Sequence, residues 1–283
     1  MEAVRIAAVI AYAPVEKEPD NLARMRRWVD RAASKGARIV CFPELNISGY
    51  GTKACRLNAA RKLNDPVTET VKAMSRRSGT TILAGLMEKD EQGGAYASHL
   101  VIQPDGCLGV YRKLHIAPPE RSVFQAGQDI PLFRSGGLTF GIQLCYDAHF
   151  PELSTFMAES GADVIFIPHA SPRGTPAEKY RSWLRHLRAR AFDNSLFIVA
   201  CNQIGDNGDG LFFPGLAVAI SPSGDILKKR FSATREAMMI VDLSMDELRN
   251  IRGHRMRYFL PNRRPELFER GRDPMKEIKE QKD

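Results

Sequence analysis

A chain of 283 residues with 43% hydrophobic residues has the composition of a globular protein and can fill one large core or two ordinary ones. No apolar run approaches the length of a membrane span, and an N-terminus with an early Glu2 is typical of a first strand rather than a signal peptide, so we expect a cytoplasmic protein without a membrane partner. The formal charge of +8 comes without a nucleic-acid-binding motif, and the most basic stretch, 181–190, predicts an amphipathic helix with a solvated or subunit-facing arginine face, which disfavours a nucleic-acid partner.

Strand-like and helix-like segments alternate from the N-terminus onward. In chain order the pattern predicts a strand, a helix, a strand, a helix, a strand and a hairpin at residues 4–13, 20–36, 37–44, 66–79, 80–90 and 97–115. Asp20 is the expected cap of the first helix and Gly36 its expected stop. The hairpin turns on Pro104, Asp105 and Gly106.

The same order of elements then repeats in the second half. Strands, helices and a second hairpin are predicted at 138–147, 151–161, 162–170, 181–190, 195–205 and 216–230. No linker separates the halves, so we expect two related α/β halves packed into one domain, residues 1–252. Residues 253–283 are polar and rich in Arg and Pro, and predict a C-terminal extension lying on the body or at a subunit interface.

Cysteine usage points to chemistry rather than to crosslinks. The five cysteines are odd in number and form no CxxC pair, and none of the six histidines forms a ligand cluster with cysteines or acids, so we expect neither a disulfide framework nor a metal site. Cys145 lies where an apolar run ends, shortly before Pro151 opens a helix. Position alone leaves two interpretations open, a small core residue or a nucleophile at a strand-to-helix turn.

Three predicted strands end in a reactive side chain, namely Glu44, Lys113 and Cys145. Residues at the carboxyl ends of strands in an α/β sheet line a common crevice, where ligands bind. Taken singly, the glutamate could cap a turn, the lysine could be solvated and the cysteine could be core. Taken together they supply a carboxylate base, a cation and a nucleophile.

The stretches FPELNISGY, YRKLHI and GIQLCYDAHFPE resemble, in order and spacing, the three catalytic motifs of the nitrilase superfamily of carbon–nitrogen hydrolases. Further similarity lies around Asn202, at 221–227 and at 262–268, so the resemblance spans almost the whole chain. It implies a four-layer α-β-β-α sandwich, a Glu-Lys-Cys triad of Glu44, Lys113 and Cys145, no cofactor, and a homodimer or larger homo-oligomer.

The chemistry follows from the residue types. A thiol with a reference pKa of ~8.5 needs a base or a nearby cation to attack an amide. Glu44 can take the thiol proton, while Lys113 and the backbone N–H of Tyr146 can stabilise the oxyanion. Glu44 would then protonate the leaving amine, and water would hydrolyse the thioester on Cys145.

Several further residues are candidates for the pocket, each with a plain alternative. In the family resemblance, Glu120 falls at a second pocket glutamate and Tyr50 near the pocket, although the first could be a solvated loop residue and the second a packing residue. His149 stands where the family often has arginine, and a Cys-His mechanism through it or His115 is an internal rival. Arg173 lies in the loop after the strand predicted at 162–170 and could bind a substrate carboxylate or be solvated.

Short members of the family that resemble this chain are mostly amidases or carbamoylases, so the resemblance implies hydrolysis of a small-molecule amide or N-carbamoyl substrate in preference to a nitrile. Nitrile hydrolysis by the same triad is one alternative, and a non-catalytic scaffold that kept the fold is another, although an intact triad argues against the scaffold. A glutaminase subunit that supplies ammonia is a further possibility.

Overall fold

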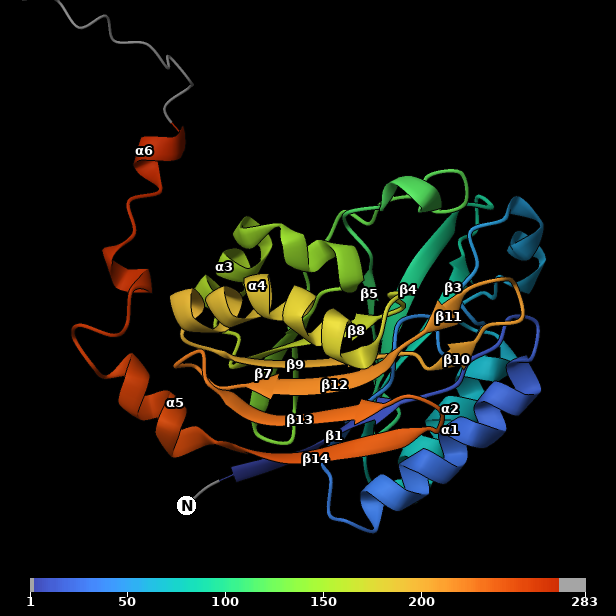
Figure 1. Ribbon diagram of the computed structural model, residues 1–283, viewed down its shortest axis with the longest axis horizontal. Helices are drawn as coiled ribbons and strands as arrows, with labels where there is room; N and C mark the ends of the chain where they lie inside the picture. The colour runs from blue at the N-terminus through green and yellow to red at the C-terminus, as the bar shows by residue number, and fades with distance from the viewer. Residues whose placement is uncertain (1–2, 270–283) are drawn as a thin grey trace, which may run out of the picture.

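The computed structural model describes residues 3–269 and contains two six-stranded sheets (Figure 1). The first has the order β14-β1-β2-β3-β4-β5 and the second the order β13-β12-β9-β8-β7-β6. The strands of the first sheet are β1 (Ala3–Ile10), β2 (Ile39–Cys41), β3 (Thr81–Lys89), β4 (Ala95–Ile102), β5 (Leu108–Arg112) and β14 (Ala237–Ser244). Those of the second are β6 (Phe133–Ser135), β7 (Leu138–Ile142), β8 (Val164–His169), β9 (Phe197–Asn202), β12 (Gly215–Ile220) and β13 (Ile226–Ser232). A short ribbon pairs β10 (Gly205–Asp206) with β11 (Phe212–Phe213).

Helices cover the outer faces of the two sheets (Figure 1). The α-helices are α1 (Glu18–Ala33), α2 (Pro66–Ser78), α3 (Pro151–Glu159), α4 (Pro176–Asn194), α5 (Met245–Arg252) and α6 (Glu266–Glu269). The 3₁₀ turns are η1 (Ala54–Ala59), η2 (Pro118–Glu120), η3 (Cys145–His149) and η4 (Leu260–Asn262). Helices α1 and α2 pack on the first sheet, and α3 and α4 on the second, which gives the predicted α-β-β-α sandwich.

Strand periodicity explains how one sheet is buried on both faces. In β1, Ile6 and Ile10 join the core between the sheets, whereas Ala7 and Val9 join the core beneath α1 and α2. Because successive side chains of a strand point to opposite faces, an almost continuous apolar run suits a strand with helices on one side and a second sheet on the other. Among the described residues, no helix is both long and apolar enough to cross a membrane.

The start of the first helix differs from the sequence prediction. Helix α1 begins at Glu18 after Lys17, so Asp20 lies in its first turn and is not its N-cap. Pro19 accounts for the earlier start, because a proline in the first turn gives up an N–H that has no helical partner and has the φ a helix needs. The helix ends at Ala33 with Ser34 as C-cap, and Gly36, at φ 77°, lies just beyond it.

The extension predicted at 253–283 falls partly within the described residues. Up to residue 269 it runs along the ends of α3 and α4 (Figure 1), with Phe259 against Phe192 at a ring-centroid distance of 5.4 Å and Arg263 paired with Glu159. The stretch 270–283 lies outside the described residues. The boundary at residue 252 stays a prediction.

Candidate active site

The pairing of the strands brings their carboxyl ends to common edges. Strands β1, β2 and β3 are mutually parallel, and so are β7, β8 and β9. Glu44 follows β2, Lys113 follows β5 and Cys145 follows β7. Because side chains after parallel strands converge at the carboxyl edge, residues far apart in sequence meet there.

The turn that carries Glu44 fits closely against β3. Leu45 adopts a left-handed φ of 52°, which is costly for a bulky residue. A Cβ at Gly85 would lie 2.3 Å from the Leu45 nitrogen, so only glycine permits this approach. Asn46 secures the turn, since its Oδ1 accepts from the Gly85 N–H at 2.8 Å.

Lys113 lies between two carboxylates. Its Nζ donates to Glu44 Oε1 at 2.8 Å, and its distances to Glu120 Oε1 and Oε2 are 2.9 and 2.8 Å. Glu44, Lys113 and Glu120 are 0%, 1% and 2% exposed, so all three charges are removed from water and depend on one another. Glu44 Oε2 also accepts the Ala170 N–H at 2.9 Å, and Tyr50 Oη donates to Glu120 Oε1 at 3.0 Å.

Cys145 begins η3 with a positive φ of 42°, an uncommon conformation for a residue with a Cβ. Asp147 holds this turn, because its Oδ2 accepts from the Leu144 N–H at 2.9 Å and from Tyr111 Oη at 2.8 Å. Its Oδ1 accepts from the His115 N–H at 2.8 Å. Cys145 itself is intermediate between buried and exposed, and the turn that carries it is held by a buried, hydrogen-bonded carboxylate.

The surroundings set the charge of each group. The pKa of Glu44 is raised to about 7, with burial as the largest cause; the charge of Lys113 opposes this rise and the negative charge of Glu120 adds to it. Burial, and then the charge of Glu44, raise the pKa of the Cys145 thiol, and Lys113 opposes this rise. Burial alone would lower the pKa of Lys113, but Glu44 and Glu120 outweigh it and raise the pKa. At neutral pH the site holds a protonated thiol beside a carboxyl that can accept a proton, as a general base requires.

The structure separates the other predicted residues. Tyr50 joins the carboxylate cluster through Glu120, and Tyr146, next to the thiol, packs edge-on against Phe150 at 5.4 Å. His149 is exposed, and its ring packs against His186 at a centroid distance of 4.5 Å with the ring planes tilted by 36°; this contact is not to Glu44, Lys113 or Glu120.

His115 and Arg173 make their contacts with residues other than Glu44, Lys113 and Glu120. His115 stacks on Phe150 at a ring distance of 3.7 Å, and its Nδ1 is 2.9 Å from Asp147 Oδ1, which suits a wall residue. The exposed Arg173 has a left-handed φ of 69°, and its backbone N–H donates to Phe212 O at 2.9 Å.

Sequence reasoning missed two supports and one cation. Gln203 Nε2 donates to the Glu44 carbonyl at 2.8 Å, and Asn202 Oδ1 accepts the Ser171 N–H at 2.9 Å. Lys179 in α4 donates to Ser171 Oγ at 2.9 Å. The charges of Lys179 and of the Cys145 thiolate each affect the pKa of the other group. Lys179 is the single lysine of α4, the helix that follows β8, which is the signal that could have identified it.

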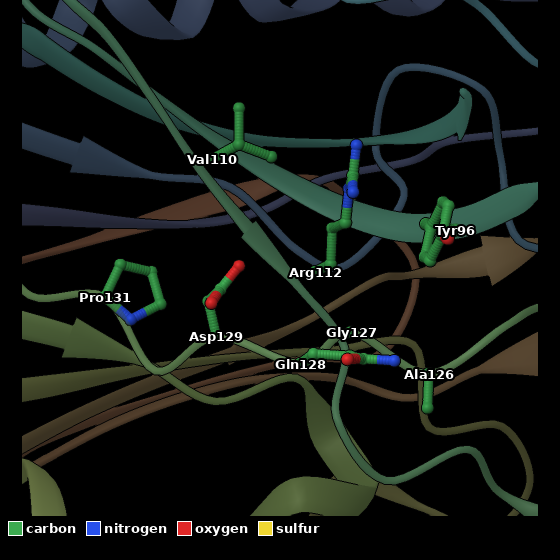
Figure 2. Close-up of a pocket in the computed structure, with 8 residues that line it drawn as sticks. All are labelled: Tyr96, Val110, Arg112, Ala126, Gly127, Gln128, Asp129 and Pro131. Atoms are coloured by element: carbon green, nitrogen blue, oxygen red, sulfur yellow. The ribbon is translucent and has the colours of Figure 1, made fainter. Parts of the chain in front are cut away.

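A separate hollow lies beside β5 (Figure 2). Its volume is about 410 Å³, and its lining includes Arg112, Tyr96 and Asp129 but none of Glu44, Lys113 or Cys145. Glu88 already binds the Arg112 guanidinium through two hydrogen bonds, and Tyr96 lies under it at 4.4 Å. The Arg112 guanidinium is therefore already paired with Glu88. Within residues 3–269, no group of three or more His, Cys, Asp or Glu side chains is arranged to hold a metal ion.

Comparison with known proteins agrees with this geometry. Residues 6–253 match the model of a family described as carbon-nitrogen hydrolase. An (R)-stereoselective amidase from a Pseudomonas species is 32% identical over 82% of this chain and 82% of its own length. A nitrilase from Pyrococcus abyssi is 30% identical over 92% of this chain and 98% of its own length.

Solved structures share the fold. A carbon–nitrogen hydrolase superfamily protein from Xanthomonas campestris superposes with a TM-score of 0.83 at 22% identity, covering 93% of this chain and 98% of that one. A mutant of an amidase from Nesterenkonia sp. AN1, solved in complex with butyramide, superposes with a TM-score of 0.77 at 24% identity, covering 94% and 96%.

Proposed function

The chain belongs to the carbon–nitrogen hydrolase family, and we propose that it hydrolyses amides through the Cys145 thiol, with Glu44, Lys113 and Cys145 as the residues that carry out the reaction. The observation that carries the proposal is the buried ammonium of Lys113, bonded to Glu44 at 2.8 Å, with both charges acting on the Cys145 thiol. A base with a pKa near neutrality beside a protonated thiol is the arrangement that general-base activation of a nucleophile needs.

In the proposed reaction, Glu44 takes the thiol proton as the Cys145 sulfur bonds to the amide carbonyl carbon. The developing oxyanion accepts hydrogen bonds from Lys113 and from the backbone N–H of Tyr146. Glu44 then returns the proton to the nitrogen as the C–N bond breaks, which releases ammonia or an amine and leaves a thioester. Water, deprotonated by Glu44, attacks the thioester and frees the acid and the thiol.

For the substrate, we propose a small carboxamide or N-carbamoyl compound. The amidase relative supports the carboxamide, and the nitrilase relative is the reason to include nitriles in the test. A screen of the purified enzyme against carboxamides, N-carbamoyl amino acids and nitriles, with released ammonia as readout, decides among them. Release from nitriles alone would overturn the amide proposal, and release from none would overturn the enzymatic one.

For assembly, we propose that two copies pair through the outer faces of α3 and α4 and the segment after α5. Exposed apolar side chains gather there, at Phe156, Phe192, Met256 and Phe259. Such a patch on a globular surface is typical of an interface. Light scattering after size-exclusion chromatography should give the mass of a dimer or larger homo-oligomer, and Phe192→Asp should reduce it to that of a monomer. A monomeric wild type would refute the proposal. The cytoplasmic location stays a prediction.

A further inference from the structure

Lys179 is a half-buried cation whose charge acts on the Cys145 thiol and that has no carboxylate partner among the described residues. Its Nζ donates to Ser171 Oγ and to Pro172 O, both at 2.9 Å, and both acceptors are neutral. Lys113, by contrast, is held by two carboxylates. An ammonium withdrawn from water without a counter-charge lowers the stability of the fold, so its retention calls for another explanation.

The backbone places this ammonium against the catalytic cluster. Ser171, which accepts from Lys179, follows Ala170, whose N–H donates to Glu44 Oε2 at 2.9 Å. Asn202 fixes the turn from the neighbouring strand, because its Oδ1 accepts the Ser171 N–H and its Nδ2 donates to Ser171 O. Burial lowers the pKa of Lys179, and the negative thiolate of Cys145 opposes this fall. In turn, the charge of Lys179 opposes the rise that burial causes in the pKa of the Cys145 thiol.

Neutral polar groups surround Lys179 on this side of the site. His169, at the end of β8, is 2% exposed, and within the described chain neither of its ring nitrogens has a hydrogen-bond partner. Burial lowers the pKa of His169, and the charges of His186 and Lys179 lower it further, so the ring is neutral at pH 7. Burial likewise lowers the pKa of His186 to about 4. Lys179 is therefore a cation without a carboxylate partner among the described residues, and the nearby imidazoles of His169 and His186 are neutral.

We propose that Lys179 binds a carboxylate on the acyl group of the substrate, so that the enzyme selects amides whose acyl part carries a negative charge. This inference rests on the proposed function for its turnover but not for its binding site. An ammonium has three N–H donors, and the two protein acceptors leave one for a ligand. The inference differs from a contact through Arg173, which is exposed on the loop before α4.

Alkylation of Cys145 tests the site without requiring turnover. Iodoacetate and iodoacetamide are near-isosteric, and only the first carries a carboxylate, so the ratio of their rates at Cys145 reports recognition of that charge. Peptide-resolved mass spectrometry gives the same ratio for the exposed Cys107, which serves as the internal reference for intrinsic reactivity. We expect the Cys145 ratio, relative to Cys107, to fall about 10-fold to 100-fold in Lys179→Met, as for a lost charged hydrogen bond. Lys179→Arg should keep most of the wild-type ratio, because arginine keeps the positive charge.

Arg181→Met is the matched control, because Arg181 is an exposed cation two residues along the same helix and should leave the ratio unchanged. If Lys179 only stabilises the turn at Ser171, or only changes the pKa of the thiol, its loss would change the rates of both reagents by the same factor. That result would overturn the proposal. A fall in the ratio for Arg173→Met but not for Lys179→Met would also overturn it. Melting curves confirm folding, and Lys179→Gln serves as a second variant if Lys179→Met does not fold.

A second experiment measures turnover of succinamate and of butyramide, in which a methyl group stands in place of the succinamate carboxylate. Lys179→Met should raise KM for succinamate about 10-fold or more and leave that for butyramide nearly unchanged. Equal changes for both would contradict the inference. If the wild type hydrolyses neither amide, the proposed function fails for these substrates, while the alkylation ratio still decides the role of Lys179.

Discussion

Lys113 Nζ lies 2.8 Å from Glu44 Oε1, although the two residues are 69 positions apart and follow different strands of the first sheet. Neither charge has appreciable contact with water, so their pairing with each other and with Glu120 fixes the ionisation of the whole cluster. The charges of Glu44 and Lys113 both act on the Cys145 thiol, which follows β7 of the second sheet. The first sheet therefore contributes Glu44 and Lys113 to the proposed catalytic residues, and the second sheet contributes Cys145.

The pKa of Glu44, raised to about 7 by burial, predicts the pH dependence of turnover. Only the carboxylate form accepts the thiol proton, so kcat/KM should fall about tenfold per pH unit below pH 7 and level off above it. Because Glu44 and Glu120 share Lys113, the apparent pKa belongs to the cluster. A pH–rate profile measured with a neutral amide checks this, and a flat profile between pH 5 and pH 7 would rule out Glu44 as the base.

Glu120→Gln should move that acid limb to lower pH. The negative charge of Glu120 raises the pKa of Glu44, so its removal lets Glu44 ionise more readily. The variant should also lose stability by about 3 kcal/mol, because a buried ammonium loses one partner. Glu88→Gln is the control, since Glu88 is a buried carboxylate bound to Arg112 outside the site and should cost stability without shifting the profile. An unshifted profile in Glu120→Gln would separate Glu120 from the titration of the base.

Gly85→Ala should impair catalysis although Gly85 has no side chain that could take part in the reaction. The added Cβ would lie 2.3 Å from the Leu45 nitrogen and would displace the turn that carries Glu44. A shift of this kind can lower kcat by about 100-fold, with overpacking costing about 1–3 kcal/mol of stability. Gly79→Ala, at the end of α2 with no atom within 4 Å, should cost stability alone. Normal kcat in Gly85→Ala would show that this close approach does not position Glu44.

His149→Ala should weaken activity by less than about tenfold. The His149 ring is exposed and contacts His186, and burial and Arg190 lower its pKa. A neutral wall residue of this kind supports the pocket but is not needed to accept the thiol proton. Steady-state kinetics on folded protein checks this, and complete loss of turnover would favour a Cys-His mechanism instead.

Sequence periodicity predicted the alternating strands and helices and the strand ends, because burial on one or two faces imposes an apolar pattern on each strand. The four-layer arrangement was predicted by the family resemblance and not by periodicity. The local apolar pattern placed Glu44, Lys113 and Cys145 after three strands, and the structure brings Glu44 and Lys113 into contact. It placed the start of the first helix wrongly at Asp20, because the fit of Pro19 within a first turn outweighs a capping side chain.

Other features depend on groups that meet only in the folded chain. The raised pKa of the Cys145 thiol comes from burial and from Glu44, so no local pattern encodes it. Likewise, Lys179 reaches the site through a turn fixed by Asn202 on a different strand. From the sequence alone, Lys179 can be placed only in the helix that follows β8.

The formation of a thioester on Cys145 is the step that defines the proposed mechanism. Hydroxylamine added during turnover intercepts a thioester and converts the acyl group to a hydroxamate, which can be measured alongside ammonia. With butyramide, or with whichever amide the ammonia screen identifies, the wild type should give both products. Folded Cys145→Ala should give neither, because it lacks the sulfur that accepts the acyl group. Ammonia release by folded Cys145→Ala at a rate comparable to that of the wild type would contradict the account.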